Sequence, residues 1–297
     1  MRILLFLLTN AAVLLVISVV FHLLGLDRLM SQQGVRLNLD SLLLISAVMG
    51  MSGSFISLLM SKWMAKQSMG VFVIESPSDD LEHWLVDTVH RQARQAGIGM
   101  PEVGIFDAPE PNAFATGMSR NSALVAVSTG LLHKMDRREV EAVLGHEISH
   151  VANGDMVTMG LLQGVVNTFV YFFATIAGYL VDRALFRSGD NGRGGYGLAY
   201  YITEMVAQIV LSILATMIVM AFSRWREFRA DQGGAHLAGR GQMIAALRAL
   251  QSAHEPTPLP GKLAAFGING GGGWMKLLMS HPPLEERIAA LEQSRQV

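Results

Sequence analysis

Four long apolar segments dominate the hydrophobic pattern of the chain. The first, residues 3–26, is nearly uninterrupted and exceeds the roughly 20 helical residues that cross about 30 Å of hydrocarbon. The second covers residues 42–60, and two weaker candidates cover residues 156–181 and 198–222. A signal peptide is the alternative for the first segment, but its apolar run is too long for one and no small-x-small cleavage site follows. The pattern therefore predicts about four transmembrane helices, arranged as two hairpins.

Between the hairpins the pattern is that of a soluble domain. Residues 81–96 are amphipathic, and the runs at 103–106 and 124–127 are typical of short strands. This part of the chain is predicted to form a small α+β unit. Within the fourth apolar segment, Glu204 lies near one end, where hydration makes a carboxylate less costly, so we interpret it as structural rather than functional.

Composition sharpens this picture. Charged residues make up 16% of the chain, against roughly 25% in typical soluble domains, and the mean hydropathy is +0.36. The net charge of -1 gives no electrostatic basis for binding nucleic acid. The chain has no cysteine, which excludes disulfides, thiolate metal ligands and cysteine nucleophiles. Any metal must therefore be held by histidine and carboxylate side chains.

A metal-binding pattern lies in the stretch EVEAVLGHEISHVANGD, residues 139–155. Asp136 before it has the spacing of a capping box and Asn-Gly near its end is a natural stop, so a helix is predicted. His146 and His150 are four residues apart and project from one face, close enough to share one ion. A zinc hydrolase also needs a carboxylate that takes a proton from the attacking water, and Glu147 provides it. The alternative is an accidental match, expected roughly 0.01 times in such a chain.

Glu227 is the candidate for a third ligand, because catalytic zinc usually has three protein ligands. It follows the fourth apolar segment, and a membrane hairpin between HEISH and Glu227 puts both on the same side of the membrane. Asp231, four residues later, is placed to accept a hydrogen bond from a ligand histidine and orient it. In the alternative, both carboxylates pair with neighbouring arginines on a solvated helix.

These elements predict a mainly α membrane protein, with about four transmembrane helices and a zincin-like α+β metalloprotease domain with a small sheet. The expected divisions are an N-terminal transmembrane hairpin (1–64), a first catalytic half (65–155), a second transmembrane hairpin (156–222) and a second catalytic half (223–297). Basic residues flank the two sides of the membrane segments almost equally, so the positive-inside rule does not fix the orientation.

The motifs HEISHVANGD and REFRAD closely resemble those of the HtpX family, bacterial membrane zinc endopeptidases related to the CAAX prenyl proteases. The likeness covers nearly the whole chain and includes the segments RILLFLLTN, SLLMSKWMAK, PNAFATG and SHPPLEERI. It implies one Zn²⁺ per subunit held by His146, His150 and Glu227, with Glu147 as the catalytic base. It also implies a multi-pass protein of the bacterial inner membrane, with its active site facing the cytoplasm. The family role is the cleavage of misfolded or damaged membrane proteins in proteolytic quality control and stress responses, so polypeptides and the lipid bilayer are the expected partners.

Two further segments resemble family elements near the active site. The first holds Asn112, Ala113, Phe114 and Ala115, which the resemblance places in an edge strand that pairs with an extended substrate; an ordinary strand is the alternative. The second is SHPPLEERI, residues 280–288, in which His281 would steady the oxyanion and Arg287 would anchor it. Alternatively, Ser280 only caps the final helix, with Pro282 in its first turn.

Two rival functions stay open from the sequence. A membrane scaffold could keep the zinc fold and bind clients without cutting them, although the intact Glu147 argues against it. A zinc hydrolase of prenylated or lipid-linked substrates would need a lateral opening from the membrane to the metal. The oligomeric state is not predicted.

Overall fold

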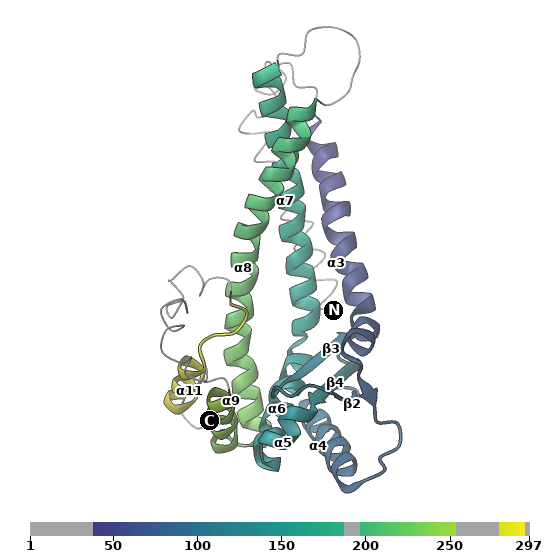
Figure 1. Ribbon diagram of the computed structural model, residues 1–297, viewed down its shortest axis with the longest axis vertical. Coiled ribbons are helices and arrows are strands. Elements are labelled where there is room, and N and C mark those ends of the chain that lie inside the picture. The colour runs from purple at the N-terminus through teal and green to yellow at the C-terminus, as the bar shows by residue number, and fades with distance from the viewer. Residues whose placement is uncertain (1–37, 187–196, 254–278, 295–297) are drawn as a thin grey trace, which may run out of the picture. The chain divides into compact units, whose positions relative to one another are not determined.

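The structure is a computed structural model that describes residues 38–186, 197–253 and 279–294. The helices are α3 (Leu39–Met69), α4 (Asp80–Ala96), α5 (Thr129–Lys134), α6 (Arg137–Asn153), α7 (Asp155–Phe186), α8 (Leu198–Ala238), α9 (Arg240–Ala253) and α11 (Leu284–Gln293), and the strands are β1 (Phe72–Val73), β2 (Glu102–Phe106), β3 (Ala113–Ser119) and β4 (Ser122–Ser128) (Figure 1). They form two compact units, each built from two stretches of chain. Of the described residues, unit 1 contains those within Met1–Phe55 and Leu161–Thr216, and unit 2 those within Ile56–Gly160 and Met217–Val297.

Three helices of the described residues, α3, α7 and α8, are long and apolar enough to cross a membrane. This confirms the second, third and fourth apolar segments as helices, while the first, residues 3–26, lies outside the described residues. The most apolar window of α8 is only 11% buried. Its outward side chains are large and apolar, which is the pattern expected of a lipid-facing helix.

Unit 1 is a packed set of membrane helices. A side chain at Gly50 of α3 would collide with the backbone of Thr168 of α7, and a Cβ atom at Gly178 of α7 would lie 3.0 Å from the ring of Tyr200 of α8. Small residues of this kind allow transmembrane helices to approach closely. The Glu204 carboxylate has a hydrogen-bond partner within the helix interface, because its Oε1 accepts from Thr175 Oγ1 at 3.1 Å.

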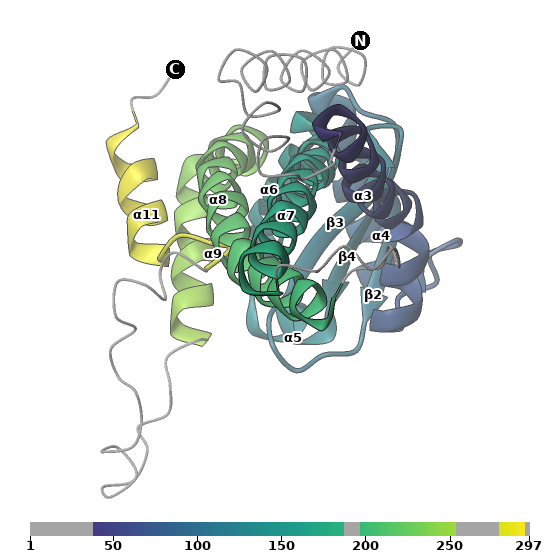
Figure 2. The same ribbon diagram turned by 90° about the horizontal axis from the view of Figure 1, so that it is seen from above.

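The sheet of unit 2 has the strand order β1-β2-β4-β3. Strands β2 and β4 are parallel, and the two outer strands run antiparallel to them. The central strand β4 is buried from Ala123 to Ser128, which explains its continuous apolar sequence. Figure 2 shows β3, an edge strand, as the strand nearest α6, with which it is in contact. The predicted strands at 103–106 and 124–127 are confirmed, and the amphipathic stretch at 81–96 lies in helix α4.

A close helix crossing brings α6 against the last turns of α8. A Cβ atom at Gly233 would collide with Ser149 Oγ, and one at Gly234 would lie 3.0 Å from the backbone nitrogen of His146. Gly145 of α6 faces the same crossing. With no side chains in the way, the α8 segment that follows the membrane span lies directly beside the HEISH helix. Helix α9 packs on α6 and α11 packs on α9.

Candidate metal centre

The helix that carries HEISH is fixed at both ends by its own sequence. Asp136 Oδ1 accepts hydrogen bonds from the backbone nitrogens of Arg138 and Glu139, and the Glu139 carboxylate accepts one from the Asp136 backbone nitrogen, so the predicted capping box is present. Gly154 ends the helix in the left-handed conformation at φ 71°. The helix therefore starts and stops where the sequence predicted.

His146, His150 and Glu227 converge on one point. The two Nε2 atoms are 3.1 Å apart, His146 Nε2 is 3.5 Å from Glu227 Oε2, and His150 Nε2 is 3.3 Å from Glu227 Oε1. Tetrahedral ligands bound at about 2.0–2.1 Å would lie roughly 3.4 Å apart. The three donors are therefore spaced to hold one small cation such as zinc.

A carboxylate fixes the tautomer of each histidine. His146 Nδ1 lies 2.9 Å from Asp231 Oδ1, and His150 Nδ1 lies 2.7 Å from Asp155 Oδ2. When a metal is bound, each Nδ1–H can donate to its carboxylate while each Nε2 presents its lone pair to the shared point. Asp231 occupies the orienting position that the sequence predicted. Asp155 was missed, since an acid directly after a helix stop also fits the first turn of the next helix.

Burial lowers the pKa of both histidines, but their hydrogen bonds to carboxylates outweigh it. The pKa of His150 rises to about 9 because of Asp155 and Glu227, and the pKa of His146 is raised by Asp231 and Glu227. Burial raises the pKa of Glu227, yet the hydrogen bonds from three histidines hold it far below its usual range. The cluster thus favours positive charge at its centre, as a metal ion would supply.

Arg287 of α11 connects the C-terminal region to this cluster. Its Nε and Nη2 atoms donate to the two carboxylate oxygens of Asp231 at 2.8 and 2.5 Å, and its Nη1 lies 3.3 Å from Glu227 Oε2. Burial raises the pKa of Asp231, but the hydrogen bonds from Arg287 and His146 outweigh this effect and lower it. Arg287 therefore holds the carboxylate that orients His146.

His281 also contacts the cluster, because its Nδ1 lies 2.7 Å from Glu227 Oε2 while its side chain is 60% exposed. The alternative in which Ser280 caps the final helix, with Pro282 in the first turn, is wrong. Helix α11 begins at Leu284, and its N-cap is Pro283, which makes no side-chain capping bond. The side chain of Pro283 has no hydrogen-bond acceptor, so it cannot cap the helix. Pro282 and Pro283 line the cavity instead.

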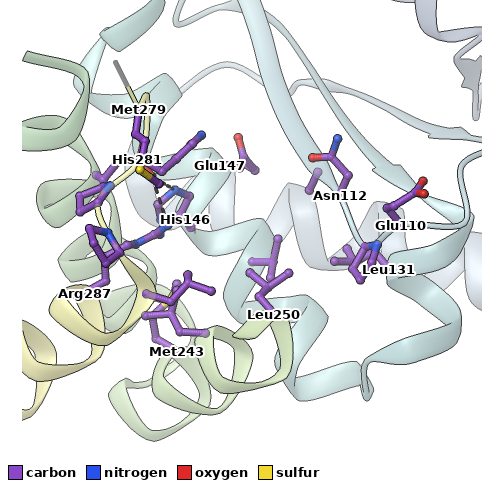
Figure 3. Close-up of a pocket in the computed structure, with 18 residues that line it drawn as sticks. Glu110, Asn112, Leu131, His146, Glu147, Met243, Leu250, Met279, His281 and Arg287 are labelled. Carbon is purple, nitrogen blue, oxygen red and sulfur yellow. Dashed lines mark hydrogen bonds and ion pairs between the residues drawn. The ribbon is translucent and has the colours of Figure 1, made fainter. Parts of the chain in front are cut away.

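A cavity of about 550 Å³ opens beside the cluster, as Figure 3 shows. Glu147, His146, Glu227, His281 and Arg287 line it together with polar groups at Glu110 and Asn112. Its remaining wall is mainly apolar and includes Leu131, Val143, Met243, Leu247 and Leu250.

Only the first two residues of the segment 112–115 reach the cavity. Asn112 and Ala113 line the cavity, whereas Phe114 and Ala115 are not among its lining residues. Ala113 opens the edge strand β3, and the ring of Phe114 packs on Phe106 at 5.5 Å between centroids.

Sequence comparison places these groups in a known family. The model of peptidase family M48 matches residues 79–295, which include all of the cluster. The chain belongs to peptidase family M48. It is 61% identical over 293 residues to the "Protease HtpX" of Thioalkalivibrio sulfidiphilus, covering 98% of each chain. It is 60% identical over 294 residues to the "Protease HtpX homolog" of Nitrosomonas europaea, covering 99% of each.

This M48 protein also resembles a solved structure, that of S. mikatae Ste24p. The TM-score is 0.62 at 17% identity, and the match covers 93% of this chain and 64% of that chain, which shows a shared fold. Membership of M48 makes the chain a metalloprotease, and its apolar helices make it a membrane protein. The resemblance to the HtpX family that the sequence motifs indicated is confirmed.

Proposed function

We propose that this protein is a zinc-dependent endopeptidase of the bacterial inner membrane that cleaves misfolded or damaged membrane proteins. The observation that carries the proposal is the convergence of His146, His150 and Glu227 in a cavity that Glu147 also lines. Three neutral or anionic donors with space for one more ligand are the composition of a catalytic rather than a structural zinc site.

In this proposal His146, His150 and Glu227 hold one zinc ion per subunit. The bound ion supplies Lewis acidity, which polarises the scissile carbonyl and lowers the pKa of water. The carboxylate of Glu147 accepts a proton from the attacking water and passes it to the leaving amine. Glu147 lies one residue from His146 on α6 and lines the cavity, so its carboxylate is within the space where substrate would bind.

Two neighbouring elements would position the substrate. His281, which is largely exposed and close to Glu227, steadies the negative charge that develops on the carbonyl oxygen. Arg287 acts through Asp231 and Glu227 rather than on the substrate. Among the described strands, β3 lies at the edge of the sheet, and in this proposal the segment Asn112–Ala115 offers backbone groups to an extended polypeptide.

The membrane arrangement completes the proposal. Hairpins 1–64 and 156–222 anchor the protein in the bilayer, and segments 65–155 and 223–297 form the catalytic domain on the cytoplasmic side. This location gives access to poorly folded membrane proteins, which supports a role in quality control and the stress response. The relatives that carry the name HtpX, at about 60% identity over almost the full length, support this assignment.

The test is cleavage of casein by detergent-purified, zinc-loaded protein. Glu147→Gln should lower kcat by at least about 100-fold while zinc content stays at one per chain, because only proton transfer is removed. Glu227→Ala should lose both zinc and activity. Zinc is measured by mass spectrometry of the metal.

Glu141→Gln is the matched control, because Glu141 is on the same helix but pairs with Arg91 outside the cavity. It should keep most of the activity and all of the zinc. A parent protein that binds zinc but cuts nothing, or a Glu147→Gln protein that cuts equally well, would favour a scaffold that binds clients without cleavage.

A further inference from the structure

We infer that the segment of α8 just beyond its apolar span binds the phosphate of an anionic phospholipid headgroup. The binding site is formed by Trp225, Arg226 and Arg229, which we call the headgroup cluster. This inference assigns a lipid ligand to the protein. It goes beyond the proposed function and does not depend on proteolysis.

The headgroup cluster continues an exposed stripe of α8. The members of the stripe follow one another at steps of four, three and four residues: Ile218, Phe222, Trp225 and Arg229. Side chains at such steps lie on one side of a helix. Ile218 and Trp225 are exposed, and the ring of Phe222 lies 5.7 Å from that of Trp225. The stripe therefore changes from apolar to aromatic and basic side chains, as expected where a helix passes from hydrocarbon into the headgroup layer.

Arg229 places an exposed positive charge at the end of this stripe. Its guanidinium carbon lies 5.3 Å from the centre of the Trp225 ring. Its Nη2 donates to Asn153 Oδ1 at 3.4 Å, which is long for a hydrogen bond. The indole ring and the amide carry no charge, so neither contact neutralises the guanidinium. An anion from the surroundings can do so.

Arg226 has hydrogen-bond donors that its neighbours use poorly. Its Nη2 donates to Ser223 Oγ at 3.3 Å, and its Nη1 lies 4.0 Å from Asp155 Oδ2, which is too far for a hydrogen bond. Its Nε is buried and has no hydrogen-bond partner among the described residues. Asp155 Oδ2 already accepts from His150 Nδ1 at 2.7 Å. Buried donors without a good acceptor are costly, so a further acceptor beside this guanidinium is favoured.

A phosphate group supplies the acceptors that these donors lack. Guanidinium groups bind phosphate oxygens through two parallel hydrogen bonds, and Arg226 and Arg229 are three residues apart, so they are neighbours on the helix. A zwitterionic headgroup also has a phosphate, but the second guanidinium would repel its ammonium group. Each arginine near an anionic membrane surface strengthens binding by about fivefold. A lipid with net negative charge is therefore the expected ligand.

The test uses the full chain in bilayers and the fluorescence of tryptophan. Phosphatidylglycerol or phosphatidylcholine with bromine atoms on the acyl chain close to the headgroup is added, because bromine quenches a tryptophan that it contacts. The difference between the parent and Trp225→Phe isolates the signal of Trp225. Phosphatidylglycerol should associate there at least about fivefold more strongly than phosphatidylcholine. This preference should fall as salt is raised, because salt screens exposed charges.

Three double variants assign the preference to the two arginines. Arg226→Gln with Arg229→Gln should bring the two lipids to within about twofold of each other, because both charges are lost. Arg226→Lys with Arg229→Lys should keep at least about half of the preference, because the charges remain. Arg94→Gln with Arg138→Gln is the matched control, since it removes the same charge from exposed positions of α4 and α6. It should behave like the parent.

The outcomes decide the inference without a measurement of protease activity. Equal quenching of the parent by the two lipids, or a parental preference in the double Gln variant, overturns it. Loss of the preference in the double Lys variant as well shows that packing rather than charge sets it, and this also overturns the inference. Replacing chloride by inorganic phosphate at equal ionic strength should leave the preference unchanged. If phosphate abolishes it, the site takes soluble phosphate and the lipid assignment is wrong.

Discussion

At the residue scale, Asp155 has two structural roles. It is the first residue of α7, and its Oδ2 accepts from His150 Nδ1 at 2.7 Å. The side chain is 8% exposed, and Arg226 is its other charged neighbour at 4.0 Å. A carboxylate that accepts from the distal nitrogen fixes the ring and makes the ligating nitrogen a better donor. The helix α7 thereby begins with the group that orients the His150 ring.

Asp155→Asn should weaken zinc binding by about 10- to 100-fold, because the amide oxygen can still accept a hydrogen bond but has no charge. Affinity is measured by competition with a chromogenic chelator. Asp107→Asn is the control, since Asp107 is exposed and accepts from Thr129 away from the metal cluster. An Asp155→Asn protein with parental zinc affinity would show that this carboxylate only begins the helix.

Sequence spacing could identify some residues of the site but not others. His146 and His150 are four residues apart on one helix, so local geometry alone predicts that they share an ion. Glu227 required the additional inference that a hairpin returns the chain to the same side. The contacts of Arg287 with Asp231 and Glu227 join segments 56 and 60 residues apart in the chain, and no local pattern encodes that distance. They depend on how α11 packs.

At the scale of elements, the close crossing of α6 and α8 controls the geometry of the cluster formed by the two histidines and Glu227. Gly233 is six residues after Glu227 on α8 and faces Ser149, which is adjacent to His150 on α6. Ser149 Oγ is held by a hydrogen bond to Gly145 O at 2.7 Å, so it has little freedom to yield. The separation between the two helices therefore determines how closely the histidines approach Glu227.

Gly233→Ala should lower the free energy of unfolding by about 1–3 kcal/mol and weaken zinc binding, because the added methyl group overpacks the crossing. Thermal unfolding in detergent, with and without zinc, measures both effects. Gly241→Ala on α9 is the control, since among the described residues no atom beyond its own stretch of helix backbone lies within 4 Å of the position its Cβ would take. This variant should be neutral or more stable by up to about 1 kcal/mol. Equal stability of the two variants would contradict the role of the crossing.

The elements themselves could be predicted where a local signal marks them. The capping box and Gly154 fixed both ends of α6, and apolar runs located the strands β2 and β4. The length of α8 could not be predicted from its apolar segment, which ends at residue 222, whereas the helix continues to Ala238. Uniform hydrophobicity marks the part that faces lipid, and the helix continues beyond it with Glu227, Asp231 and Gly233 against α6.

At the scale of the whole molecule, the proposed third metal ligand follows closely in sequence on the end of the fourth apolar segment. Glu227 is five residues beyond the apolar segment that ends at Phe222, or roughly 7.5 Å at 1.5 Å per residue. Trp225, between them, is 53% exposed, and the guanidinium of Arg229 lies 5.3 Å from its ring centroid. Tryptophan and arginine favour the lipid headgroup layer. Cleavage is therefore expected near the membrane surface, where a membrane-tethered polypeptide is already concentrated.

The orientation in the membrane can be tested directly because the chain contains no cysteine. A single cysteine in place of Lys134 on α5 reports the side of the metal centre, and one in place of Leu198 reports the opposite end of α8. Both positions are exposed, Leu198 to 76%. With the active site in the cytoplasm, a membrane-impermeant maleimide should label Leu198→Cys in intact cells and Lys134→Cys only after the inner membrane is disrupted. The reverse pattern would place the metal centre outside the cytoplasm, and equal labelling of both variants in intact cells would mean that α8 does not separate the two compartments.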